Sequence, residues 1–225
     1  MLIGFLTPLA AEYRTFGRAK GITYCGNDYI VSKCGIGKEA RNKALKLIRS
    51  GCEMLIGWGV AGSLDPSLKN GDLLISSYFQ NEQNIMFEFK NDFTKVFTKE
   101  LKPLRPKRGG ILTVNQMILD STTKENLARK YRMSAIDMES TIIAETAKDA
   151  SIPYISIRSI CDEMDTEMPE FLKYSLKKNG DPAIFKISQE LLSRPRDILA
   201  LVRLGWRFHK SLKTLKAASL LITRQ

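Results

Sequence analysis

Four acidic residues and one arginine stand out because they lie within or close after short apolar runs. They are Glu12 after the first run, Asp137 and Glu139 around the end of another, and Arg158 and Asp162 inside and at the end of a third. One such carboxylate alone is often a helix cap or a solvated side chain. Several carboxyl groups at one edge of a sheet can exchange protons with a ligand and bind its hydroxyl groups. The set therefore indicates a polar site at the ends of neighbouring strands.

The scarcity of histidine excludes other chemistries. His209 is the only histidine in 225 residues and lies close to the C-terminus, whereas a nucleophilic triad needs a histidine held in a rigid cleft. A histidine-based zinc site is excluded for the same reason, and the four cysteines contain no C-x-x-C pair. We interpret the cysteines as buried free thiols of a reducing compartment. No metal and no cofactor is expected.

The elements that must position these residues alternate between β-rich runs and helical patterns, which is typical of an α/β fold with a mainly parallel sheet. The runs LIGFL, MLIGWGV and YISIRSI are almost continuously apolar, as a sheet covered on both faces requires. The expected strands are residues 2–6, 28–34, 54–60, 72–78, 85–89, 110–114, 135–138 and 154–160. The expected helices are residues 9–19, 38–50, 93–101, 123–132, 139–150 and 183–192.

The positive charge is concentrated in the last part of the chain. The net charge is +11, and residues 194–225 contain eight Lys or Arg residues and one Asp, a net +7. This change in composition predicts a domain at residues 1–193 and a basic amphipathic helical tail at residues 194–225. The start of the chain lacks the basic region of a signal peptide, and no apolar run is long enough to span a bilayer.

The tail pattern supports two interpretations. Residues 201, 204, 208, 212 and 215 fall within about 80° of one another on a helix, with basic residues opposite. The helix could dock on its own domain and leave a solvated basic face. It could instead bind anionic lipid, with snorkelling basic side chains and inserted apolar ones. The membrane-contact candidates are then Arg203, Arg207, Phe208, Lys210 and Leu212. Nucleic-acid binding is less favoured, because aromatics suited to stacking are few in the tail and no known reading motif occurs.

Two glycine-rich segments match the dinucleotide fingerprint G-x-G-x-x-G/A, residues 35–40 and 57–62. The first opens a helix, but the acidic residue expected at the end of the next strand is missing. The second leads into a loop and a strand, which rules out a Rossmann turn. Both segments place small residues where the backbone can approach a ligand and direct N–H groups at it.

Four motifs in order resemble the nucleoside phosphorylase/methylthioadenosine nucleosidase superfamily over residues 1 to about 190. They are residues 35–38 (GIGK), residues 59–64 (GVAGSL) with 71–75 (GDLLI), residues 136–140 (IDMES) and residues 158–162 (RSICD). The resemblance implies a three-layer α/β fold around a central mixed, distorted sheet, with cleavage of a purine N-glycosidic bond. Such cleavage builds oxocarbenium character on the sugar and negative charge on the base.

The resemblance also implies a role for each polar residue. Asp162 would protonate N7 of the leaving purine, in a protonated or proton-sharing state favoured by burial. Glu12 would activate water, Glu139 would accept the ribose 2′ and 3′ hydroxyls, and Met138 would pack under the sugar. The remaining positions are Arg158, Gly59, Val60 and Ala61 at the nucleophile or anion site, and Met117, Ile118 and Gly62 in the purine pocket.

Departures from the family pattern bear on the nucleophile and the substrate. Phosphorolytic members bind phosphate through an arginine and a hydroxyl after the central strand, and residues 57–60 (GWGV) offer neither. Water is therefore favoured over phosphate. Cys161 replaces the usual serine, and residues 81–90 are too short for the histidine-bearing segment of many members, which leaves the 5′ subsite undefined. Because relatives are commonly dimeric or larger, a homodimer is expected.

A second resemblance concerns the subfamily. Residues 6–12 (LTPLAAE), residues 58–68 and the Arg194-Pro195 start of the tail are similar to the hopanoid-associated nucleosidase/phosphorylase family. This implies release of adenine from adenosylhopane, a nucleoside-lipid, by a cytoplasmic enzyme peripheral to the inner face of the cell membrane. The alternatives are a methylthioadenosine/S-adenosylhomocysteine nucleosidase or another purine nucleoside phosphorylase and, from a different class, a non-catalytic nucleoside-binding or nucleic-acid-binding protein.

Overall fold

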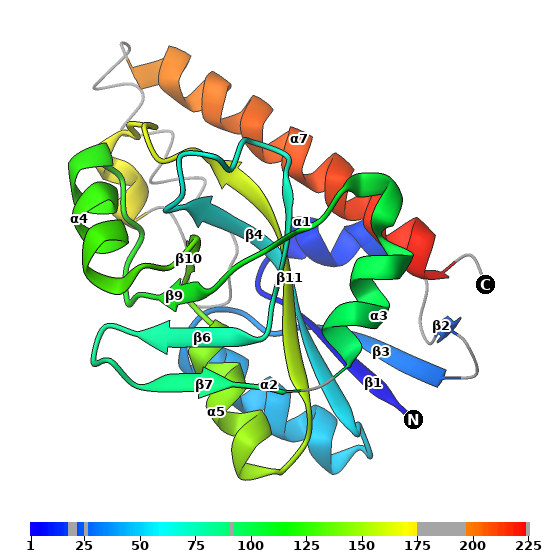
Figure 1. Ribbon diagram of the computed structural model, residues 1–225. Coiled ribbons are helices and arrows are strands. Elements are labelled where there is room, and N and C mark those ends of the chain that lie inside the picture. The colour runs from blue at the N-terminus through cyan, green and yellow to red at the C-terminus, as the bar shows by residue number, and fades with distance from the viewer. Residues whose placement is uncertain (18–21, 25–26, 91, 175–196, 224–225) are drawn as a thin grey trace.

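The computed structural model describes residues 1–17, 22–24, 27–90, 92–174 and 197–223 (Figure 1). The described strands join into one 11-stranded sheet. They are β1 (Ile3–Thr7), β2 (Ile22–Tyr24), β3 (Asn27–Lys33), β4 (Met54–Ser63), β5 (Leu73–Ser76), β6 (Tyr78–Asn81), β7 (Met86–Glu88), β8 (Lys107–Arg108), β9 (Ile111–Thr113), β10 (Ala135–Asp137) and β11 (Tyr154–Asp162). The helices are α1 (Ala10–Tyr13), α2 (Lys38–Arg49), α3 (Phe93–Glu100), α4 (Ser121–Tyr131), α5 (Ser140–Asp149) and α7 (Asp197–Thr223), with 3-10 turns η1 (Arg14–Phe16), η2 (Lys102–Leu104) and η3 (Glu170–Tyr174).

Strand β4 is the centre of the sheet. Its first half pairs in parallel with β1 on one side and with β11 on the other. Its end pairs in antiparallel fashion with β10, so the sheet divides there into two arms. The register of β11 shifts between Ile160 and Asp162, where Asp162 aligns with Gly62. The expected mixed, distorted sheet is confirmed, and it brings the ends of β1, β4 and β11 to one edge.

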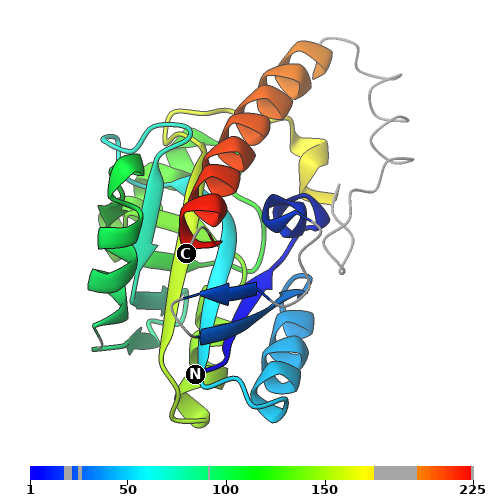
Figure 2. The same ribbon diagram turned by 90° about the vertical axis from the view of Figure 1, so that its right-hand side faces the viewer.

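Helices cover both faces of this sheet, which gives three layers (Figures 1 and 2). Residues of α2 and α5, including Leu47 and Ile143, pack against one face in a buried cluster with Leu55 of β4. Residues of α3 and α7, including Phe97 and Leu215, pack against the other face. The side chains of β4 and β11 are almost all buried, as their apolar sequences predict.

Helix α7 docks on its own domain along its C-terminal half. Leu215, Ala218 and Ile222 are fully buried in the core. The hydroxyl of Ser219 donates a 2.6 Å hydrogen bond to the carbonyl oxygen of Thr15, and Ser211 does the same to Ile160. The first turns of α7 instead extend beyond the sheet (Figure 2). The contacts therefore favour docking for the second half of the helix.

Two of the membrane-contact candidates contact the domain, which argues against the lipid interpretation of the apolar stripe. Leu212 packs against the core, and Arg207 donates a hydrogen bond of 2.5 Å to Thr166 Oγ1, so both are engaged by the domain. Phe208 is half-buried, whereas Arg203 and Lys210 are exposed. The apolar stripe faces the domain because the underlying sheet offers an apolar surface on which it can pack. Among the described residues, no helix is long and apolar enough to cross a bilayer.

Other element boundaries differ from the sequence expectation for local reasons. The strand expected at residues 72–78 is broken, because the Ser76 hydroxyl bonds both the N–H and the carbonyl of Tyr78 and turns the chain into β6. The helix expected at residues 9–19 is reduced to α1 and η1, which end at Gly17 with a φ of 71°. The helix expected at residues 183–192 lies outside the described residues. Cys34, Cys52 and Cys161 are buried free thiols, as expected.

Candidate active site

Glu12 lies in the short helix α1, directly after β1, and is only 1% exposed. Its Oε2 accepts a 2.7 Å hydrogen bond from the N–H of Leu9, and its Oε1 accepts one of 2.9 Å from the N–H of Val60 in β4. Burial raises the pKa of Glu12 to about 7, against the opposing effects of the Arg158 charge and the two N–H groups. A carboxyl group that titrates near neutrality can accept a proton from a bound molecule.

Arg158 lies in the middle of β11 and is fully buried. Its Nη2 donates a 2.7 Å hydrogen bond to Oδ2 of Asp137, which also accepts from the hydroxyl of Ser140. Asp137 Oδ1 accepts from the hydroxyl of Thr113, so the carboxylate that binds Arg158 is itself held in place. Within the described residues, Nε and Nη1 of Arg158 have no hydrogen-bond partner. A buried donor without a partner is costly, so Nη1 is suited to a polar ligand atom.

Glu139 precedes α5 and is 5% exposed. Its Oε2 lies 3.9 Å from Nη2 of Arg158. Burial, followed by the repulsion from Asp137, raises the pKa of Glu139 well above its usual range, although Arg158 opposes both effects. The two carboxyl oxygens of Glu139 can exchange hydrogen bonds with a pair of hydroxyl groups.

Asp162 ends β11 and forms a pair that sequence reasoning missed. Its Oδ2 accepts a 2.5 Å hydrogen bond from Nζ of Lys124 in α4. The Lys124 side chain is fully buried, and that of Asp162 is 13% exposed. A hydrogen bond between an ammonium group and a carboxylate is charge-assisted and is among the stronger kinds. The signal available was a lysine in the first turns of a helix, where the helix dipole disfavours a cation.

Two glycines of β4 lie beside these groups. A Cβ atom on Gly59 would lie 2.6 Å from both Glu12 Oε1 and Arg158 Nη1, so these two atoms are no more than twice that distance apart. A Cβ on Gly62 would lie 2.9 Å from Asp162 Oδ2. Three residues of strand span about 10 Å. The Glu12–Arg158 pair and Asp162 therefore border one segment of β4 at positions about 10 Å apart along the strand.

The predicted pocket residues fall into two groups. Met138 and Ile118 pack at the edge of one apolar cluster with Ile136, whose side chain also contacts the Gly62 position. Met117 packs in a different cluster, with Leu119 and residues of α7. Ile118 therefore shares a cluster with the residue that borders Gly62, and its place in the purine pocket stays a prediction. Met117 is directed toward α7 because the chain turns between the two residues into α4.

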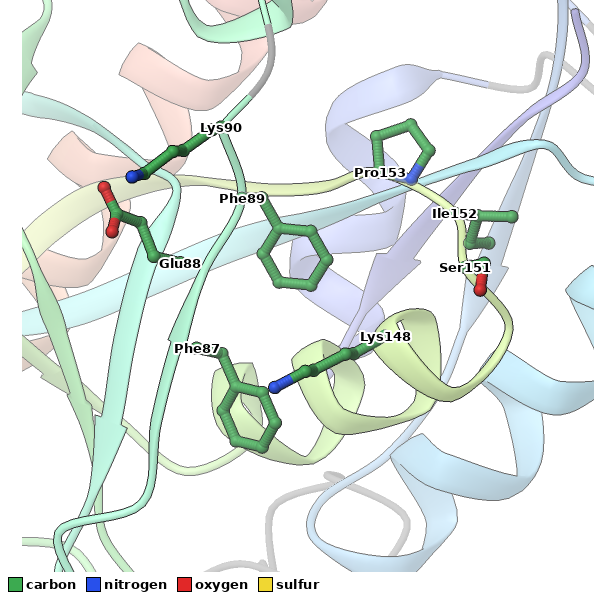
Figure 3. A pocket seen from close by; sticks show the side chains of 8 residues that line it. All are labelled: Phe87, Glu88, Phe89, Lys90, Lys148, Ser151, Ile152 and Pro153. Atoms are coloured by element: carbon green, nitrogen blue, oxygen red, sulfur yellow. The ribbon is translucent and has the colours of Figure 1, made fainter.

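A pocket of about 350 Å³ lies elsewhere (Figure 3). Its lining is Phe87, Glu88, Phe89, Lys90, Lys148, Ser151, Ile152 and Pro153. It contains none of the predicted site residues and opens beside the start of β11, whereas Asp162 ends that strand. The nine residues of β11 span about 30 Å, so this pocket is separate from the polar groups around Gly59 and Gly62.

Comparison with known proteins identifies the family. A model of the phosphorylase superfamily matches residues 7–192. The 5′-methylthioadenosine/S-adenosylhomocysteine nucleosidase of Tolumonas auensis is 27% identical over 190 residues, which are 73% of this chain and 83% of that protein. The nucleosidase of the same name from Shewanella oneidensis is 27% identical over 185 residues, which are 72% of this chain and 78% of that protein.

Solved structures show the same fold. The Campylobacter jejuni 5′-methylthioadenosine/S-adenosylhomocysteine nucleosidase has a TM-score of 0.74 at 16% identity, covering 100% of this chain and 97% of that chain. The futalosine hydrolase of Helicobacter pylori has a TM-score of 0.71 at 20% identity with the same coverage. The superfamily, the fold and the enzyme class expected from the sequence are confirmed. The chain belongs to the phosphorylase superfamily and is an enzyme of its nucleosidase/phosphorylase class.

Proposed function

We propose that this enzyme hydrolyses the N-glycosidic bond of an adenosine that carries a modified 5′ position, and releases adenine. The observation that carries the proposal is the placement of Glu12 and Arg158 at Gly59, with Asp162 facing the same strand at Gly62. A nucleoside bound along β4 would have its C1′ between a proton acceptor at one end and a proton donor at the other. The similarity to nucleosidases supports this orientation.

Each group has a defined part in the proposed reaction. Glu12 accepts a proton from water as the water oxygen bonds to C1′ of the ribose. The C1′–N9 bond breaks and its electron pair passes into the purine, which takes up a proton at N7 from Asp162. Glu139 binds the ribose hydroxyls, which fixes the sugar relative to both ends. The proton on Glu12 then returns to solvent while Asp162 takes one up from it, and the products are adenine and a 5-modified ribose.

The electrostatics of the Gly59 end support water as the nucleophile. The free Nη1 donor of Arg158 is next to the Glu12 carboxyl group, whose pKa is about 7. An ionised Glu12 would repel a phosphate at that position, whereas it can accept a hydrogen bond from water. Val60 and Ala61 stay proposed as further members of this anion site, and the backbone N–H of Val60 already binds Glu12.

The test is adenine release from methylthioadenosine and from adenosylhopane, each with and without phosphate, using wild-type enzyme and Asp162→Asn. We expect release without phosphate, with the free sugar as co-product, and a loss of about 10²- to 10⁴-fold in rate for the variant. Strict dependence on phosphate, with a sugar 1-phosphate as product, would instead assign a phosphorylase. Binding of a nucleoside with no release of base from any substrate would favour the non-catalytic alternative.

The finer substrate that we propose is adenosylhopane, and the exposed face of α7 supports it. Four large apolar residues in its first turns are exposed: Ile198 by 45%, Leu199 by 69%, Val202 by 59% and Trp206 by 78%. They fall within about 100° of one another on the helix. Lys210, Lys213 and Lys216 are exposed on the following turns. An apolar stripe continued by basic residues matches an anionic membrane surface.

This face differs from the one predicted by the apolar periodicity. The proposed membrane contact keeps Arg203 and Lys210 and no longer includes Phe208, Arg207 and Leu212. It adds the four exposed apolar residues Ile198, Leu199, Val202 and Trp206. A lipid-linked nucleoside would then be bound from the membrane by an enzyme that lies at its inner face. A methylthioadenosine/S-adenosylhomocysteine nucleosidase is the second candidate, favoured by the curated relatives, and needs no such face. The homodimer stays a prediction.

A further inference from the structure

Strand β11 contains one extra residue just before its end, and this residue is Cys161. Up to Ile160 the strand pairs with β4 in one constant register, in which Ile160 lies opposite Ala61. The register then shifts, and Asp162 lies opposite Gly62. Within the described strands, Cys161 has no partner in the register with β4 or with β5. This arrangement is a β-bulge, a feature that is common beside active sites, where it redirects a side chain.

The bulge decides which side chain lies beside Gly62. If the register of Ile160 continued, Cys161 would lie opposite Gly62. Asp162 would then lie opposite Ser63. Because side chains alternate between the two faces of a strand, a shift of one position also moves a side chain to the other face. With the bulge, a Cβ atom on Gly62 would lie 2.9 Å from Oδ2 and 3.2 Å from Oδ1 of Asp162. The bulge thus gives this position a carboxyl group in place of a thiol.

Asn70, in the loop before β5, bonds the carbonyl groups of the bulge. Its Nδ2 lies 3.0 Å from the carbonyl oxygen of Cys161 and 3.1 Å from that of Ile160. Two further acceptors belong to α7, the carbonyl oxygen of Arg207 at 3.0 Å and the hydroxyl of Ser211 at 3.2 Å. Carbonyl oxygens only accept hydrogen bonds, so the nitrogen of the amide must face them. The side chain is 9% exposed, and these acceptors offset the cost of its burial.

Helix α7, which runs along the end of β11 (Figure 1), contributes a second side-chain donor. Ser211 is fully buried, and its hydroxyl donates a 2.6 Å hydrogen bond to the carbonyl oxygen of Ile160. The loop before β5 also bonds the chain beyond the bulge, because the backbone N–H of Asn70 donates to Oε1 of Glu163 at 3.2 Å. The loop and α7 therefore hold the residues on both sides of the bulge.

We propose that Asn70 is a positioning residue, which stabilises the bulge and thereby sets the carboxyl group of Asp162 beside Gly62. A bulge interrupts the ladder of hydrogen bonds between strands, so its buried carbonyl groups need other donors. Asn70 supplies them, with support from Ser211. The consequence for catalysis rests on the proposed function, whereas the placement of Asp162 by the bulge does not.

The position of the acid matters more for the rate than for substrate binding. Asp162 gives its proton to the purine as the C1′–N9 bond breaks, so a displaced carboxyl group is missed mainly in the transition state. A displacement of about 1 Å can cost about 100-fold in rate. Loss of the Asn70 amide should therefore lower kcat and leave KM almost unchanged.

Two variants remove the donors, and a third serves as the control. Asn70→Leu keeps the branched shape of the side chain without its N–H groups. Ser211→Ala is the smaller change and is the second variant if leucine prevents folding. Thr146→Val is the matched control, because it removes a buried hydroxyl that bonds the carbonyl oxygen of Ile142 in its own helix α5.

The structural test is the crystal structure of each variant. We expect the register shift at Cys161 to be lost or moved in Asn70→Leu, with the Asp162 carboxyl group displaced from Gly62 by about 1 Å or more. Ser211→Ala should show the same change to a smaller extent, and Thr146→Val should leave the bulge as it is. An unchanged bulge in both Asn70→Leu and Ser211→Ala would overturn the inference.

The kinetic test uses the same proteins and adenine release. We expect kcat to fall about 10- to 100-fold in Asn70→Leu, with KM within about threefold of wild type, and no fall in Thr146→Val. Added to Asp162→Asn, Asn70→Leu should cause little further loss, because its effect passes through that carboxyl group. Losses that multiply in the double variant, or an equal fall of kcat in Thr146→Val, would assign Asn70 a general structural role and overturn the positioning role.

The crystal structures separate this inference from the proposed function. If the Asp162 carboxyl group moves in Asn70→Leu but the wild type releases adenine from no substrate, the proposed function fails and the control of the bulge by Asn70 stands. If the wild type releases adenine and the carboxyl group stays beside Gly62 in both donor variants, the inference fails and the proposed function stands.

Discussion

The backbone N–H of Val60 donates a 2.9 Å hydrogen bond to the carboxylate of Glu12, which lies 48 residues earlier in the chain. This bond connects the short helix α1 to the central strand β4 at the residue that follows Gly59. A second connection supports it, since the indole Nε1 of Trp58 donates to the hydroxyl of Thr15, which donates to the carbonyl oxygen of Glu12. The candidate proton acceptor is thus held by the strand it faces.

Replacement of Gly59 by alanine should disable this end of the site. The added Cβ would lie 2.6 Å from both Glu12 Oε1 and Arg158 Nη1, closer than real Cβ contacts, so one of the two buried groups must move. We expect a fall of about 100-fold or more in kcat/KM for adenine release, as for other displaced catalytic groups. Gly205→Ala is the control, because a Cβ there meets nothing within 4 Å. Equal activity of both variants would contradict the placement.

The titration of Glu12 predicts opposite effects of pH on activity and stability. Water activation needs the ionised carboxylate, so the rate should rise with pH around the Glu12 pKa of about 7. The folded chain retains between pH 4.5 and 7 a proton that the unfolded chain has released, so this group destabilises the folded state as the pH rises. The cost reaches about 3 kcal/mol above pH 7.

The measurement is the unfolding free energy of wild type and Glu12→Gln in urea at pH 5 and pH 8. The variant should gain stability relative to wild type at the higher pH, and it should lose the low-pH limb of the rate profile along with most of its activity. A difference between the two proteins that is the same at both pH values would refute the raised pKa.

Glutamate at two exposed positions of α7 should prevent membrane binding without affecting the chemistry. Val202→Glu with Trp206→Glu places two negative charges in the apolar stripe, where side chains are 59% and 78% exposed. Binding to vesicles of anionic lipid, measured by sedimentation, should be lost while methylthioadenosine cleavage stays within about twofold. Ile85→Glu, at a 51% exposed apolar residue of the β6–β7 turn, is the control. Unchanged sedimentation of the double variant would exclude this face.

The docked half of α7 should contribute strongly to the stability of the domain. Leu215→Ala removes a fully buried side chain from the core and should cost about 2–5 kcal/mol of unfolding free energy. Leu220→Ala truncates a leucine that is 43% exposed on the same helix and should cost no more than about 0.5 kcal/mol. Similar denaturation midpoints for the two variants would show that α7 packs otherwise.

The carboxylates at the sheet edge were predictable because the apolar runs that precede them can be read from the sequence. Continuous burial of β1, β4 and β11 follows from their composition, and parallel pairing then brings Glu12 and Asp162 to the same edge. Lys124 was not predictable in this way. It lies 38 residues before Asp162, and its side chain looks like any other helical lysine until α4 packs against the end of β11.

The face of α7 was predictable only in part. Periodicity identified an apolar stripe, and Leu212 and Leu215 of that stripe do contact an apolar partner. The identity of the partner is a tertiary property, and the buried Ser211 and Ser219, which bond main-chain carbonyls of the domain, are polar residues that a lipid interpretation leaves unexplained. Hydrogen bonds to distant carbonyls have no signature in local sequence.

The bond from Ser219 to Thr15 joins residues 204 positions apart and supports the helix that carries Glu12. During synthesis, the first residues of the site emerge from the ribosome long before the helix that braces them. The nascent chain should therefore hold a strand edge and a carboxylate without their final support until α7 has been released. Catalytic competence should then appear only once α7 has been made and has docked.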